Sequence, residues 1–208
     1  GPGQQNRFIW QTAAEDTYSD LMGNYIGTPG MNVRYAKFEG DLNERAEEYR
    51  VALDNKGKPL SITHKLPENH SGNELTEDEA KDLVYATIKK HYGLISEDIE
   101  FISAEPSKKP ERMDWEFVFK DIISAKLPEG DKRIRVTING DEISSHNRFV
   151  FVPEEWDRKE KDQQAVLDVV SNAMSFLLII TILAAVVLGI IHSTKKKITT
   201  ELVLYIIS

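Results

Sequence analysis

Residues 133–140 have the sequence Arg-Ile-Arg-Val-Thr-Ile-Asn-Gly, in which apolar and polar side chains alternate before an Asn-Gly pair. Alternation with a period of two is typical of a strand that buries one face, and Asn-Gly is typical of a tight hairpin turn. We therefore expect a return strand through residues 143–152. Trp115, Phe117 and Phe119 alternate in the same way and predict a further strand before this hairpin. Together these residues predict an antiparallel meander.

A helix is predicted ahead of the meander, over residues 76–93. Thr76 and Glu79 form a capping box, in which each side chain satisfies a free backbone N–H group of the first turn. Gly93 is a natural C-terminal stop. We expect one side of the helix to pack on the sheet, because these residues recur at helical spacing: Ala80, Leu83, Val84, Thr87, Ile88 and His91. A short strand from Ile99 to Ala104 follows the helix.

The first 70 residues show a weaker version of the same plan. The expected elements are a helix over residues 16–25 and strands over residues 33–38, 49–53 and 60–66. The two halves either repeat one unit or are unrelated, and the sequence leaves both interpretations open. The expected fold class is α+β, with one or two helix-plus-antiparallel-meander units, at residues 7–67 and 74–153, joined by a linker from Pro67 to Asn73. Residues 1–6 are expected to be a tag remnant, Gly1-Pro2-Gly3, and a disordered start.

Residues 169–191 contain no charged side chain. As a helix this segment is roughly 34 Å long, enough to cross the ~30 Å hydrocarbon core of a bilayer with some tilt. We therefore expect one transmembrane helix, preceded by a juxtamembrane connector at residues 154–168. The positive-inside rule places the following Lys195, Lys196 and Lys197 in the cytoplasm, and hence residues 1–168 outside it.

Residues 192–208 combine this basic flank with an apolar tail. The tail, residues 198–208, is either the start of a second membrane helix or an unrelated extension. The sequence alone does not decide between these two interpretations.

The net charge of the chain is −8, and three lysines and one glutamate lie beyond residue 168, which leaves residues 1–168 at −10. Nucleic-acid binding requires a basic surface, so this balance argues against it. It also argues against the soluble part lying flat on an anionic lipid surface. The chain has no cysteine, which excludes disulfides, thiol catalysis and cysteine-ligated zinc.

Four residues are candidates for an interaction surface: Arg112, Asp114, Arg133 and Arg135. Arg112 and Asp114 flank the start of the strand that contains Trp115, where they either pair with each other or contribute to a binding surface. Arg133 and Arg135 belong to the sheet face that the helix is expected to leave open.

No catalytic motif is complete in the sequence. The five histidines are scattered and form none of the pairs at helical spacing that bind zinc. Glu154 and Glu155 begin a run similar to the Glu-Glu-x-x-x-Arg motif of some membrane metalloproteases, but its sixth position is Lys159. We therefore assign Glu154, Trp156 and Arg158 to the connector, with Trp156 near the membrane interface, and expect no metal or cofactor in this chain.

A resemblance to a known family rests on four short patterns: Phe38-Glu39-Gly40 with Glu44-Arg45-Ala46-Glu47-Glu48-Tyr49, Arg112-x-Asp114-Trp115-x-Phe117, Gly140-Asp141-Glu142, and Pro153-Glu154-x-Trp156-x-Arg158. Over about residues 7–191 the chain resembles the extracytoplasmic region of bacterial CPBP-family intramembrane metalloproteases, which are relatives of the CAAX proteases. The unit opened by Leu75-Thr76-x-x-Glu79-Ala80 is similar to PepSY-type, cystatin-like domains. The resemblance implies that the catalytic residues and zinc belong to later membrane helices, so none is carried over to this sequence.

Three hypotheses follow. In the first, the chain is a non-catalytic domain that binds a protein or peptide and restrains or feeds an intramembrane protease; its partners are then the bilayer, that ligand and downstream membrane helices. In the second, it is a stand-alone single-pass interaction or assembly protein. In the third, it is a hydrolase that uses pairs of Glu and Asp, which requires a carboxylate with a raised pKa inside a cleft.

Overall fold

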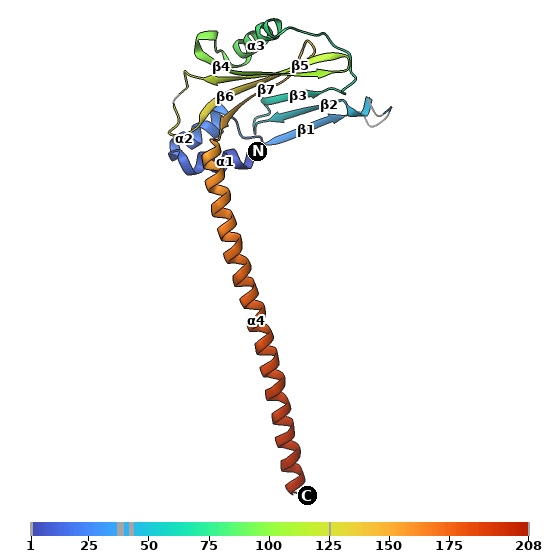
Figure 1. Ribbon diagram of the computed structural model, residues 1–208, viewed down its shortest axis with the longest axis vertical. Helices are drawn as coiled ribbons and strands as arrows, with labels where there is room; N and C mark the ends of the chain where they lie inside the picture. Colours follow the sequence, from blue (N-terminus) through green and yellow to red (C-terminus); the bar gives the residue numbers. More distant parts are fainter. Residues whose placement is uncertain (1, 37–39, 42–43, 125, 208) are drawn as a thin grey trace. The chain divides into compact units, whose positions relative to one another are not determined.

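The computed structural model describes residues 2–36, 40–41, 44–124 and 126–207, and the chain divides into two units, Gly1–Pro153 and Glu154–Ser208. The first unit is an α+β domain built on one seven-stranded antiparallel sheet, and the second is a single helix (Figure 1). The predicted α+β class with a C-terminal apolar helix is therefore confirmed.

The first unit begins with short helices, which seven strands and the longer helix α3 follow. In chain order they are α1 (Pro2–Thr12), α2 (Glu15–Asp20), the π-helical turn η1 (Leu21–Tyr25), β1 (Met31–Ala36), the 3₁₀ turn η2 (Glu44–Ala46), β2 (Glu48–Leu53), β3 (Pro59–Lys65), α3 (Glu77–Tyr92), the 3₁₀ turn η3 (Ser96–Asp98), β4 (Ile99–Lys109), β5 (Arg112–Asp121), β6 (Asp131–Asn139) and β7 (Glu142–Phe151).

Two predicted strands differ from the observed ones at their ends. The strand predicted at residues 33–38 begins at Met31, and residues 37 and 38 lie outside the described part of the chain. The strand predicted to end at Ala104 continues to Lys109. Its polar second half has no alternating pattern, but it stays extended because β5 pairs with it as far as Arg112.

The seven strands lie in the order β1-β2-β3-β7-β6-β5-β4. The two halves of the domain therefore share one sheet, rather than forming a sheet each. They meet where Thr63 of β3 pairs with Ser145 of β7, the single aligned pair between these strands. All other neighbouring strands are connected within one half of the domain. The Thr63–Ser145 junction is therefore the strand pairing that brings together segments far apart in the sequence.

Helix α3 covers the β4–β7 half of the sheet and forms the main core with it. The capping box of Thr76 and Glu79 and the left-handed C-terminal Gly93 are both present, as predicted. The buried apolar side chains of this core are Ala80, Val84, Ile88, Ile99, Trp115, Phe117, Phe119, Ile134, Val136 and Ile138. Burial of this alternating set holds the helix on the sheet, because each large apolar side chain contributes about 1.5–3 kcal/mol when it leaves water.

The N-terminal helices pack against the end of β7. Phe8, Ile9 and Leu21 are buried, and the Gln5 side chain accepts a hydrogen bond from the backbone N–H of Val150 at 3.2 Å. Residues 1–6, which the sequence predicted to be disordered, thus lie in α1 from residue 2 onward. The missed signal is the pair Phe8 and Ile9, which is too short to define a helical period by itself.

The second unit is the helix α4 (Glu154–Ile207). Its stretch from Glu154 to His192 is long and apolar enough to cross a membrane, by length and composition. The predicted connector, transmembrane segment and basic flank are therefore continuous parts of one helix.

Candidate functional site

Strands β1, β2 and β3 extend the sheet beyond the helix-covered half and expose an apolar surface. Thr63 pairs with Ser145, and Ser145 pairs with Thr137. Thr137 lies between Val136 and Ile138, whose side chains belong to the α3 core, so Thr137, Ser145 and Thr63 all face away from α3. Side chains alternate along a strand, so the residues flanking Thr63 point to the side of α3. The β1–β3 face, as we call this surface, consists of Met31, Val33, Tyr35, Tyr49, Val51 and Ile62.

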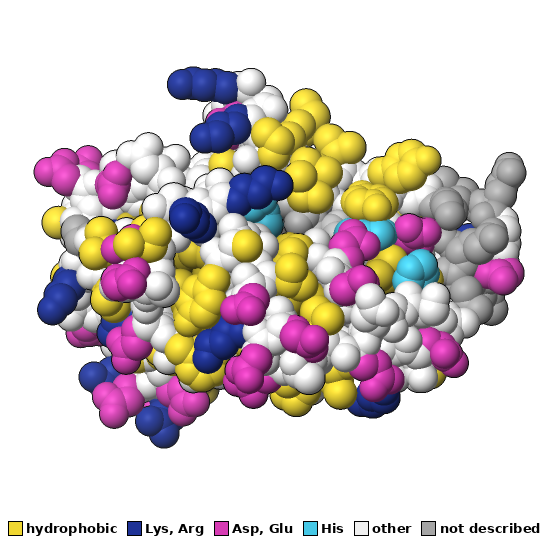
Figure 2. Space-filling model, turned by 90° about the horizontal axis from the view of Figure 1, so that it is seen from above, with side chains coloured by type: hydrophobic (Ala, Val, Ile, Leu, Met, Phe, Trp, Pro, Cys, Tyr) yellow, Lys and Arg dark blue, Asp and Glu magenta, His cyan; other side chains and the backbone are white. Residues whose placement is uncertain are grey.

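The β1–β3 face is open to solvent, since Met31 is 58% exposed and Tyr35 69% exposed. Among the described residues no helix packs on it, in contrast to the half that α3 covers. Figure 2, which views the molecule from above Figure 1, shows hydrophobic side chains at the surface beside histidine and acidic side chains. The register aligns Val33, Val51 and Ile62 across the three strands, so these side chains form one continuous row.

The two edges of the sheet differ in how they are protected. The edge strand β4 contains Pro106, four charged residues and a bulge between Phe101 and Ser103, all of which disfavour the addition of another strand. The edge strand β1 has the sequence Met-Asn-Val-Arg-Tyr-Ala, with Arg34 as its one charged residue. Edge β1 is therefore the better template for an added strand.

The opposite face of β1 and β2 carries an ion-pair cluster. Glu48 is buried and accepts from the Arg34 Nε at 2.5 Å, and it also pairs with Arg50. Both guanidinium groups hold the pKa of Glu48 below its ordinary value, with the Arg34 hydrogen bond as the largest cause. This cluster cross-links β1 and β2 and leaves their apolar side chains on the β1–β3 face.

His64 joins the two halves of the domain at the border of the β1–β3 face. Its Nδ1 lies 2.7 Å from a carboxylate oxygen of Glu142, and its Nε2 lies 3.0 Å from Glu47. A ring nitrogen can donate only when it carries a proton, so both contacts are hydrogen bonds in the doubly protonated ring. The ring also stacks on Tyr49, with 3.9 Å between ring centroids.

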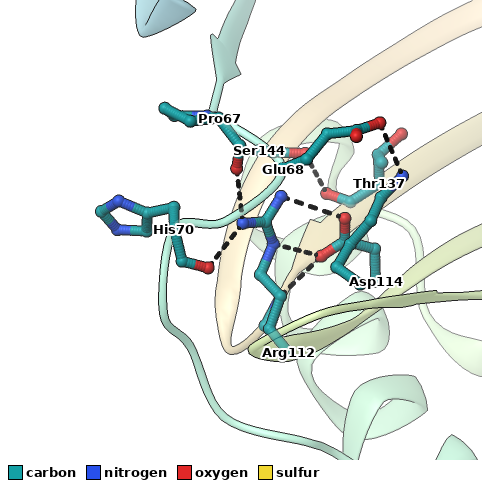
Figure 3. A network of polar contacts seen from close by, with 9 residues as sticks. Pro67, Glu68, His70, Arg112, Asp114, Thr137 and Ser144 are labelled. Carbon is teal, nitrogen blue, oxygen red and sulfur yellow. Dashed lines mark hydrogen bonds and ion pairs between the residues drawn. The ribbon is translucent and has the colours of Figure 1, made fainter. Parts of the chain in front are cut away.

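Arg112 and Asp114 form a buried structural pair instead of a surface (Figure 3). The Arg112 Nε donates to Asp114 at 2.7 Å, and its Nη1 donates to the carbonyl oxygens of Pro67 and His70 at 2.7 Å each. Asp114 also accepts the backbone N–H of Gly140. The pairing alternative is confirmed, and the assignment of these two residues to an interaction surface is corrected, because they fasten the linker 67–73 inside the fold.

Arg133 and Arg135 lie on the sheet face away from α3, where the sequence placed them. The Arg133 guanidinium lies 3.6 Å from the centroid of the Phe151 ring and also pairs with Asp131. Arg135 pairs with Glu116 at 3.0 Å. Both arginines therefore have intramolecular partners, and the Arg135 guanidinium also lies 4.8 Å from the centroid of the Phe149 ring.

The residues assigned to the connector lie in the first turns of α4. Glu154, Glu155 and Asp157 place negative charge at the start of the helix, where its dipole favours anions. Trp156 and Arg158 follow in the same turns. Lys195, Lys196 and Lys197 belong to the same helix beyond the apolar stretch.

The histidine and acidic side chains of the described residues form no potential metal-binding cluster. No group of three potential ligands occurs in that part of the chain. The ring centroids of His91 and His146 lie 4.1 Å apart. Burial, followed by the charge of His91, lowers the pKa of His146 to about 4. His146 is therefore neutral near pH 7 and hydrogen-bonds the Tyr92 hydroxyl at 2.9 Å.

The β1–β3 face was missed as a site in the sequence. Strands were predicted at residues 33–38 and 49–53, but in each unit the helix was expected to pack on one face of the sheet. The available signal was a mismatch in size: the single helix predicted in this half, residues 16–25, is too short to cover three strands.

Comparison of the chain with protein-family models, with curated proteins and with solved structures found no match.

Proposed function

We propose that this protein is a membrane-anchored binding domain that holds an extended protein segment against edge strand β1 and the β1–β3 face. The observation that carries the proposal is the exposed row of Val33, Val51 and Ile62 beside a weakly protected edge. Contiguous exposed apolar surface on a soluble domain marks an interaction site. An added strand would gain backbone hydrogen bonds from β1 and apolar contacts from the face.

The chemistry of the partner follows from the charges around the face. Glu47 and Glu142 lie at its border, and residues 1–168 have a net charge of −10. We therefore expect a segment with a net positive charge in which every second residue is apolar, because opposite charges speed encounter and exclude acidic competitors, and alternate side chains of an added strand point to one face.

The proposed setting is the outer side of a bacterial membrane. The α4 stretch supplies an anchor, and the lysines at 195–197 are the cytoplasmic flank under the positive-inside rule. We propose further that the domain is the PepSY-like, non-catalytic part of a CPBP-type intramembrane metalloprotease, whose zinc is expected in later membrane helices. It would then present or restrain that protease's substrate.

A second candidate is a stand-alone single-pass interaction protein. The continuous helix α4, which supplies one membrane crossing, suits it equally well. The two candidates are separated by the gene sequence that follows the codon for Ser208. Several further hydrophobic segments favour the protease parent, and an immediate stop codon favours the stand-alone protein.

The binding proposal is tested by selecting ligands from a displayed library of random ten-residue peptides on the full chain in nanodiscs. We expect enrichment of peptides that have a net positive charge and an apolar residue at every second position, and at least tenfold weaker binding to the Val33→Arg variant. Ile95→Arg is the matched control, because Ile95 is another exposed apolar residue of the same domain. Enriched peptides that bind the Val33→Arg variant and the unaltered chain equally well would contradict the proposal.

A further inference from the structure

A second potential site lies at the opposite end of the sheet, at the connection between β5 and β6. It is a pocket of about 450 Å³, and its lining includes Lys120, Asp121, Ser124, Lys126, Leu127 and Lys132. The pocket shares no residue with the β1–β3 face, so it is independent of the proposed function.

Lys132 is the unusual member of this lining. It is 6% exposed, and its Nζ lies 5.1 Å from the centroid of the Tyr25 ring. No carboxylate forms an ion pair with it within the described part of the chain. A buried ammonium group without a counter-charge costs free energy, and this cost falls when an anion enters beside it.

The carboxylates nearest the pocket are already engaged. Asp121 accepts hydrogen bonds from the backbone N–H groups of Ile123 and Ser124 and from the Ser124 hydroxyl. Asp131 pairs with Lys120 at 2.7 Å and with Arg133 at 3.3 Å. Both carboxylates stabilise the connection, and Asp121 also raises the pKa of the neighbouring Tyr25. Neither forms an ion pair with Lys132 among the described residues.

A second cation increases the local positive charge. The Arg148 guanidinium lies 4.7 Å from the centroid of the same Tyr25 ring. Burial is the main cause that raises the pKa of Tyr25 far above its ordinary value, so this phenol stays neutral and supplies no negative charge. The acidic Glu100 also lines the pocket and limits the size of the positive potential at its mouth.

We propose that this pocket binds a phosphate group, with Lys132 as the buried anchor and Lys126 at the mouth. Lysine ammonium groups bind phosphate as point charges. The volume admits a phosphate with a small organic substituent. Both a free phosphate ester and the headgroup of a phospholipid carry this group.

The test is a titration of the full chain with inorganic phosphate in maltoside micelles, followed by backbone amide NMR shifts. We expect saturable shifts at residues 120–124 and 130–132. Lys132→Met should weaken binding by about tenfold or more, because a buried charge-assisted contact is lost. Lys126→Met, a surface change that leaves the core intact, should weaken it by about threefold. Lys58→Met, in the turn between β2 and β3, is the matched control and should have no effect.

Nanodiscs distinguish the two sources of phosphate. If a lipid headgroup occupies the pocket, phosphatidylglycerol nanodiscs should shift the same amides without added phosphate, and nanodiscs of an uncharged glycolipid should not. If a soluble ester is the ligand, both nanodiscs should respond alike to added phosphate. Shifts that are absent, spread over the surface, or unchanged in both the Lys132→Met and Lys126→Met variants would overturn the proposal.

Discussion

The guanidinium group of Arg112 and the carboxylate of Asp114 lie 2.7 Å apart in the interior of the domain, two residues apart on one strand. Side chains at i and i+2 share a face of a strand, so the pair needs no long-range step to form. Its other bonds, to Pro67 and His70, are long-range and fix the linker between the two halves.

Arg112→Ala should lower the free energy of unfolding by about 3–5 kcal/mol, because Asp114 is left as an unpaired buried charge and two carbonyl groups lose their donor. Denaturant unfolding in detergent measures this value. Arg135→Ala removes an ion pair whose side chains are 42% and 39% exposed, and should cost less than about 1 kcal/mol. Equal losses in the two variants would show that the Arg112 pair is not structural.

The two apolar sets of the sheet should respond differently to truncation. Phe117→Ala opens a cavity in the α3 core and should cost about 3–5 kcal/mol. Tyr35→Ala removes an exposed ring from the β1–β3 face and should cost about 0.5 kcal/mol or less. Thermal unfolding of both variants checks this contrast, and a large loss for Tyr35→Ala would mean that the face is covered within the domain.

The low pKa of His146 predicts a pH dependence of stability. In the unfolded chain this histidine takes up a proton near pH 6.5, whereas in the folded domain it does so only near pH 4. Between these values the unfolded state binds more protons, so the free energy of unfolding must fall as the pH falls. Allowing for partial solvent exposure, we expect a loss of roughly 1–2 kcal/mol between pH 7 and 4.5.

His146→Gln isolates this contribution. The difference in unfolding free energy between the unaltered protein and this variant should change with pH in that window and become constant below pH 4. Carboxylates with lowered pKa, such as Glu48 and Glu79, lose their contribution mainly below pH 4.5 and do so in both proteins. A difference that stays constant from pH 7 to 4.5 would contradict the assignment.

The absence of cysteine makes the proposed topology easy to measure. Asn55→Cys, in the exposed turn between β2 and β3, should react with a membrane-impermeant maleimide in intact cells. Ser193→Cys, beside the three lysines, should react only after the cells are opened. The reverse pattern would place the domain in the cytoplasm and remove the outer setting from the proposed function.

Local features of the fold could be predicted from the sequence because local physics decides them. The capping box at Thr76, the stop at Gly93 and the Asn139-Gly140 turn each depend on residues within a few positions. The Thr63–Ser145 junction could not be predicted, because one aligned pair between distant strands leaves no periodic signal. For the same reason the sequence did not show that Arg112 is buried against Pro67 and His70, which lie 45 and 42 positions earlier.

Hydrogen exchange at the two edges of the sheet tests the central claim most directly. The full chain in nanodiscs is compared with and without a peptide selected from the displayed library. An added strand at β1 predicts at least tenfold slower exchange for the alternate amides of Met31–Ala36 that do not bond to β2, and no change in β4, the other edge. Protection confined to β4, or protection of neither edge at a peptide concentration that saturates binding, would contradict the claim.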